Sequence, residues 1–72
     1  MSLIIEALQA KYVANRLEAI ANLQTYLSTS VGVGEHPDIV LECDKLISKI
    51  SEAEGKLVTL KTLIEQSSSK EE

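Results

Sequence analysis

Two long stretches of this sequence carry apolar residues at helical spacing, and a short segment rich in glycine separates them. Residues 3–28 contain no glycine or proline and are dominated by Ala, Leu, Gln, Glu and Lys, which favours one helix of about seven turns. The second stretch begins at Pro37, because proline is favoured at the first position of a helix, and we expect it to run to about residue 66. The final residues, SSSKEE, have no apolar side chain to dock, so we expect 67–72 to form a disordered tail.

The second helix has the clearer pattern, because its apolar residues alternate at intervals of four and three. This spacing, sustained over about four heptads, is typical of a coiled coil. We call these residues the heptad seam: Ile39, Cys43, Leu46, Ile50, Ala53, Leu57, Leu60 and Ile64. Val40 and Ile47 widen the seam on one side, and Leu41 and Leu63 lie away from it.

The first helix carries two apolar seams instead of one. The first seam, interrupted by Asn15, consists of Ile5, Leu8, Tyr12, Ala19, Leu23 and Tyr26. The second seam, interrupted by Glu6 and Gln24, consists of Leu3, Ala10, Val13, Leu17, Ile20 and Leu27. At about 100° per residue the two seams lie roughly a third of a turn apart, so this helix needs neighbours on two sides.

Together these elements predict an all-α fold, an antiparallel two-helix hairpin resembling a coiled coil. The single domain is residues 1–66, with helix 1 at about 3–28, a loop at 29–36 and helix 2 at about 37–66. A lone hairpin would leave the second seam exposed, which monomers rarely tolerate, so we expect self-association into a four-helix or larger bundle, most simply a dimer. The residues expected at the interface between copies are Val13, Leu17, Ile20, Leu27, Ile39, Cys43, Leu46, Ile50, Leu57, Leu60 and Ile64.

The composition excludes several partners. With eleven acidic and seven basic residues, the net charge of −4 argues against nucleic acid and anionic membranes, which bind clustered Lys and Arg. The apolar runs are too short to span a bilayer, and we expect no signal peptide. A single cysteine cannot form an internal disulfide, which favours a cytoplasmic location.

The sequence predicts no enzyme, metal site or cofactor. The only histidine, His36, has no serine or cysteine at a known motif spacing, and Cys43 falls inside the heptad seam, where a small apolar role is expected. No set of residues supplies a nucleophile, a base and an orienting group together. The glycines of VGVG are expected to end helix 1 and reverse the chain, since the spacing matches no phosphate-binding motif.

A small-ligand site at a subunit interface is the alternative hypothesis. Aromatic rings and cationic groups repeated by symmetry could hold a nucleotide or another anion, and backbone N–H groups at the start of a helix could assist. The candidate ligand-binding residues are Tyr12, Arg16, Lys11, Tyr26, Gly32, Gly34 and His36.

Residues 31–57, VGVGEHPDIVLECDKLISKISEAEGKL, resemble small helical proteins of tailed bacteriophages, in which a VG-x-GEHPD corner precedes a charged helix ending in AE-x-KL. The resemblance implies a helical hairpin made in the cytoplasm of an infected bacterium. It carries no functional residues over to this chain. Our main hypothesis is therefore a non-enzymatic oligomeric interaction protein, a phage accessory factor or inhibitor that binds a host protein. A purely structural assembly module is a further alternative.

Overall fold

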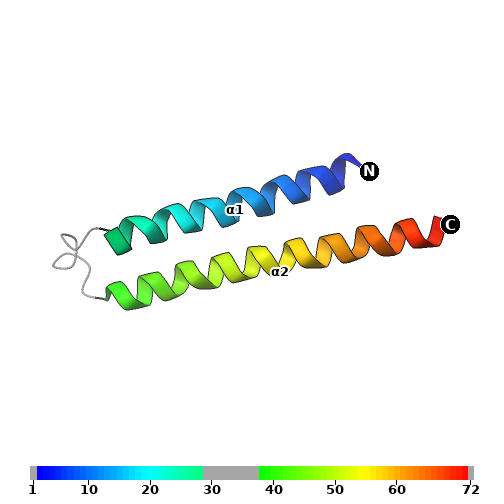
Figure 1. Ribbon diagram of the computed structural model, residues 1–72. Helices are drawn as coiled ribbons and strands as arrows, with labels where there is room; N and C mark the ends of the chain where they lie inside the picture. Colours follow the sequence, from blue (N-terminus) through cyan, green and yellow to red (C-terminus); the bar gives the residue numbers. More distant parts are fainter. Residues whose placement is uncertain (1, 29–37, 72) are drawn as a thin grey trace.

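The protein is a hairpin of two long helices. The computed structural model describes residues 2–28 and 38–71, and their side chains as far as Ser67. Helix α1 spans Leu3–Ser28 and helix α2 spans Ile39–Glu71, and the two run antiparallel with both chain ends at one end of the molecule (Figure 1). The molecule measures 58 × 17 × 15 Å. Its radius of gyration is 16.7 Å, against about 11 Å for a compact domain of this length, so the hairpin is a rod. The predicted helical hairpin is confirmed.

Both helices begin with a side-chain cap. The Ser2 hydroxyl accepts a hydrogen bond from the N–H of Ile5 at 3.1 Å. In α2 the carboxylate of Asp38 accepts one from the N–H of Leu41 at 3.0 Å. Asp38 is therefore the N-cap and α2 begins at Ile39, two residues later than the expected start at 37, because a carboxylate satisfies an N–H group that would otherwise lack a partner. The predicted loop at 29–36 lies outside the described residues.

The C-terminal end of α2 also differs from the sequence-based expectation. We expected the helix to end near residue 66 and 67–72 to be a disordered tail, whereas α2 continues to Glu71. The polarity of SSSKEE favoured a disordered tail. The segment nevertheless permits a helix, because it contains no glycine or proline and serine costs a helix only a few tenths of a kcal/mol per residue. A tail without apolar residues lacks a docking face, but it can still extend a helix that is already formed.

The first seam of α1 packs against the heptad seam of α2. Every residue of these two seams is buried or half-buried, apart from the interrupting Asn15. The most buried residues are Ala19, Leu46, Ala53 and Leu60, with exposed fractions of 3–8%. Two of these four are alanines, so the contact between the helices contains little apolar volume.

Such a core leaves the chain with a large exposed surface. The accessible surface is 5691 Å², whereas a compact monomer of 7.9 kDa is expected to expose about 4,400 Å². Among the described residues no side chain is less than 2% exposed. The isolated hairpin is therefore a marginal structure, because few side chains are fully removed from water.

Candidate functional site

The two long sides of the hairpin differ in chemistry. Helical geometry at 100° per residue places the second seam of α1 on the same side as Val40, Ile47 and Val58 of α2. The opposite side carries polar and charged residues from both helices, among them Asn15 and Lys49. We call the first the apolar face and the second the polar side.

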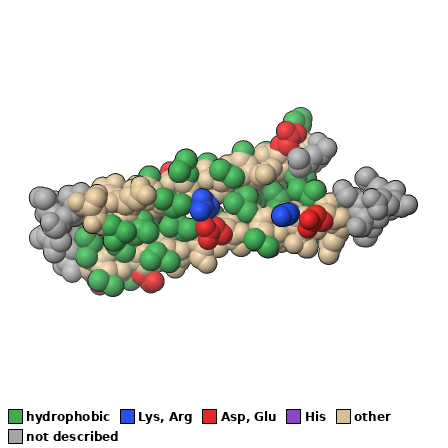
Figure 2. All heavy atoms as spheres, viewed as in Figure 1, with side chains coloured by type: hydrophobic (Ala, Val, Ile, Leu, Met, Phe, Trp, Pro, Cys, Tyr) green, Lys and Arg blue, Asp and Glu red, His purple; other side chains and the backbone are tan. Residues whose placement is uncertain are grey.

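The apolar face is broad and open to solvent. Figure 2 shows hydrophobic side chains of both helices lying next to one another on this face, with few charged side chains among them. Apart from Leu3 at the open end, which is 81% exposed, its six exposed large residues have exposed fractions between 50% and 76%. They are Val13, Leu17, Leu27, Val40, Ile47 and Val58. Ile20 of the second seam is half-buried beside them. Monomers rarely leave so many large apolar side chains uncovered on one side, so this face is the first candidate for a binding surface.

One ion pair crosses between the helices at this face. Nε of Arg16 donates a hydrogen bond to Oε2 of Glu54 at 2.8 Å, and the two side chains are 43% and 50% exposed. A half-exposed pair contributes less than about 1 kcal/mol while water screens it. Its main effect on the face is to neutralise both charges within the hairpin.

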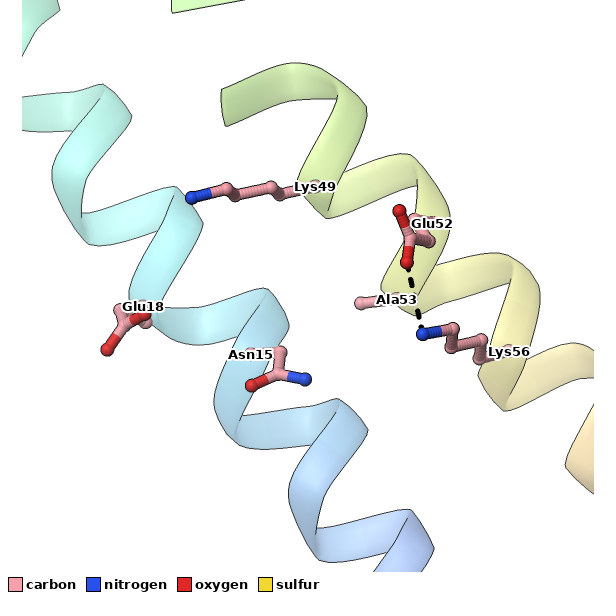
Figure 3. A pocket seen from close by; sticks show the side chains of 6 residues that line it. All are labelled: Asn15, Glu18, Lys49, Glu52, Ala53 and Lys56. Carbon is pink, nitrogen blue, oxygen red and sulfur yellow. Dashed lines mark ion pairs between the residues drawn. The ribbon is translucent and has the colours of Figure 1, made fainter. Parts of the chain in front are cut away.

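A shallow cleft of about 310 Å³ lies on the polar side. It is lined by Asn15, Glu18, Lys49, Glu52, Ala53 and Lys56. In Figure 3 the Lys49 side chain extends from α2 toward α1, and the carboxylate of Glu18 is directed away from α2. Nζ of Lys56 forms an ion pair with Oε1 of Glu52 at 3.0 Å. Two lysines and two glutamates balance each other here, so the cleft has no strong preference for an anion or a cation.

A second hollow, of about 420 Å³, surrounds Tyr12 and shares Glu52 and Lys56 with the first. The ammonium group of Lys56 lies 5.5 Å from the centre of the Tyr12 ring, within cation–π range. Leu8, Leu60 and Leu63 contribute an apolar wall. The hollow therefore combines an aromatic ring, a cation and an apolar surface.

The structure separates the residues predicted to bind a ligand. Tyr12 faces the hollow on the polar side, whereas Arg16 is turned to Glu54 at the apolar face. Lys11 is exposed, and Tyr26 is half-buried in the first seam. Gly32, Gly34 and His36 lie outside the described residues. Tyr12 therefore faces a hollow, and its cationic neighbour there is Lys56 rather than Arg16.

The predicted interface residues divide into two groups. The heptad-seam members Ile39, Cys43, Leu46, Ile50, Leu57, Leu60 and Ile64 lie along the side of α2 that faces α1 of the same chain, buried or half-buried. The second-seam members remain on the open face, where Val13, Leu17 and Leu27 are exposed. The sequence interpretation missed Val58, although its spacing of eleven residues from Ile47 places it close to the same line along α2.

Three glutamates of α2, Glu42, Glu52 and Glu54, each form an ion pair with a cationic side chain. Ion pairs within the helix join Glu42 to Lys45 at 3.6 Å and Glu52 to Lys56 at 3.0 Å. Glu54 is engaged by Arg16. An exclusively acidic surface on α2 is therefore not present among these residues.

Within the part of the chain that the structure describes, no three His, Cys, Asp or Glu residues approach closely enough to hold a metal ion. Neither described helix has an apolar stretch long enough to cross a bilayer. The chain matches no protein-family model, and no curated protein or solved structure is significantly similar to it. The hypotheses about function therefore depend on the two surfaces described above.

Proposed function

We propose that this chain is a non-enzymatic interaction protein that works as an assembly of helical hairpins. The observation that carries the proposal is the apolar face, which presents six large hydrophobic side chains at exposed fractions of 50% or more. A surface of this kind favours protein partners, since burying it contributes binding free energy without requiring a specific charge. Such an apolar helical face binds its partner by packing into a groove or against another pair of helices.

The resemblance of the GEHPD segment to phage proteins supports a setting for this activity. In that setting the protein is an accessory factor or inhibitor made in the bacterial cytoplasm, and its partner is a host protein. Glu42, Glu52 and Glu54 are paired with neighbouring cations, which argues against a partner that binds an acidic surface of α2. The apolar face is therefore the better-supported contact surface.

Native mass spectrometry of gently purified protein tests the proposal. The expected spectrum shows a multiple of the 7.9 kDa chain, with or without a bound protein. A matched pair of variants, Leu17→Glu on the apolar face and Leu63→Glu on the polar side, identifies the surface that is used. The Leu17 variant is expected to lose the mass of the additional chains and of any bound protein, and the Leu63 variant is expected to keep it. A bare monomer of the unaltered protein would overturn the proposal.

The hollow at Tyr12 supports a second candidate function, the binding of a small aromatic anion such as a nucleotide. Tyr12 supplies a surface for stacking, and Lys56 supplies positive charge beside the ring. An added mass of a few hundred daltons per subunit in the same spectrum would favour this alternative. Tyr12→Ala should then remove that mass, whereas Tyr26→Ala, at the other aromatic position of the first seam, should retain it.

A further inference from the structure

The apolar face has a definite extent along the hairpin. Because Arg16 lies opposite Glu54, the antiparallel helices align so that Leu27 and Val40 are near the corner and Val13 and Val58 are near the middle. From residue 13 to residue 27 the face is about 20 Å long at 1.5 Å per residue. The acidic residue that interrupts the second seam, Glu6, lies beyond this stretch, toward the open end.

We propose that this face is covered by the same face of a second copy of the chain, which gives a twofold bundle of four helices. The inference rests on the proposed function, in which the chain acts through assembly, and it names the occupant of the surface. In a twofold contact the same patch is used on both copies, so the patch must be compatible with itself in shape and charge.

The exposed area of the hairpin is large enough for such a contact. The chain exposes about 1,300 Å² more than a compact monomer of its mass. A stable protein–protein interface removes about 800 Å² from each partner. The excess surface of the whole rod is therefore larger than the area that one such interface removes from each partner.

The charge distribution makes the face compatible with itself. Two copies with a net charge of −4 each repel one another overall. On the face, however, Arg16 and Glu54 already neutralise each other, and the six large residues around them are uncharged. Because the two charges of this ion pair neutralise each other, the pair does not favour a partner of opposite charge. An identical surface therefore fits here without repulsion.

The two helices also differ in how much of their circumference is polar. Helix α1 has four charged residues among 26, whereas α2 has eleven among 33. A helix with apolar residues on several sides is typical of a buried position. The second seam, with its exposed member Ala10 and the neighbouring exposed Ala14, therefore places α1 toward the centre of the bundle and the charged part of α2 toward water.

Thiol labelling tests the inference without disturbing the rest of the hairpin. In a Cys43→Ala background, a single cysteine replaces either Ile47, which is 53% exposed on the apolar face, or its exposed neighbour Ser48, which points about 100° away. The rate of reaction with a maleimide is measured at about 100 µM and about 0.1 µM protein, which brackets a micromolar dimer. Helical circular dichroism of both variants and the sedimentation mass of the unaltered protein are measured in parallel, so that an unfolded variant is distinguished from an uncovered face.

We expect Ile47→Cys to react roughly tenfold more slowly than Ser48→Cys at the higher concentration and equally fast after dilution. Equal rates at both concentrations, or protection that survives dilution with a monomeric mass, would overturn the inference. An assembly of several chains in which the cysteine at position 47 stays reactive would overturn the assigned face but leave the proposed function standing. A bare monomer would overturn both.

Discussion

The exposed side chain of Leu17 allows the sharpest energetic test of the apolar face. Leu17 is 63% exposed in the single hairpin. Complete burial of a leucine contributes about 1.5–3 kcal/mol, so covering the exposed part contributes roughly 1–2 kcal/mol per chain and about 2–4 kcal/mol per dimer. Because 1.4 kcal/mol corresponds to a factor of ten in an equilibrium constant, Leu17→Ala should weaken a dimer roughly 30- to 800-fold.

The same substitution has a much smaller effect if the chain acts as a monomer. In a monomer only about a third of the Leu17 side chain is packed against the protein, so Leu17→Ala should lower the unfolding free energy by about 0.5–1 kcal/mol. Sedimentation equilibrium over a range of protein concentrations separates the two cases, because it measures the dissociation constant directly.

Leu63→Ala is the matched control for this experiment. Leu63 is 54% exposed, close to Leu17 in accessibility, but it lines the hollow beside Tyr12 on the polar side. We expect its replacement to leave the dissociation constant within about threefold of the unaltered protein. If both leucines weaken association equally, or neither does, the reasoning that assigns the contact to the apolar face is refuted.

Three further substitutions test the local structure. Gly55→Ala should raise the unfolding free energy by about 0.5–1 kcal/mol, since a Cβ at this position meets no atom within 4 Å; a lower urea midpoint would contradict this. Asp38→Ala should lower it by about 1 kcal/mol, because the N–H of Leu41 loses its acceptor, whereas Asp38→Asn should retain most of the stability. Arg16→Gln should cost less than about 1 kcal/mol if water continues to screen Glu54, and about 3 kcal/mol or more if a second copy encloses that carboxylate. Urea unfolding at high and low protein concentration distinguishes these last values, and a small loss at both would argue against an enclosed pair.

The helices could be predicted because their signals are local. The absence of glycine and proline from 3–28 and the regular spacing of the heptad seam are both visible in short windows of sequence. The ends were predicted less well, since Pro37 and Asp38 both favour a helix start and only the hydrogen bond to Leu41 shows which residue caps it. At the other end, polarity favoured a disordered tail although the residues tolerate a helix.

The candidate surfaces could be predicted only in part. The second seam of α1 followed from spacing alone, but the polar side depends on which residues of α2 lie beside those of α1. Arg16 and Glu54 are 38 positions apart, so no local pattern links them. The contact of Lys56 with Tyr12 depends in the same way on how the two helices are aligned. Sequence reasoning therefore grouped Tyr12 with Arg16, which is four positions away, and missed the cation that lies beside the ring.

The ion pair between Arg16 and Glu54 also bears on which register the hairpin adopts. A heptad seam repeats every seven residues, so sliding α2 by one heptad, about 10 Å, would again bring apolar residues against α1. Such a slip would place Arg16 opposite Ile47 in one direction and opposite Lys61 in the other. Either alternative leaves Glu54 without its cation, and the second brings two positive charges together. A contact that adds little to the overall stability can thus select one alignment among several that are similarly apolar.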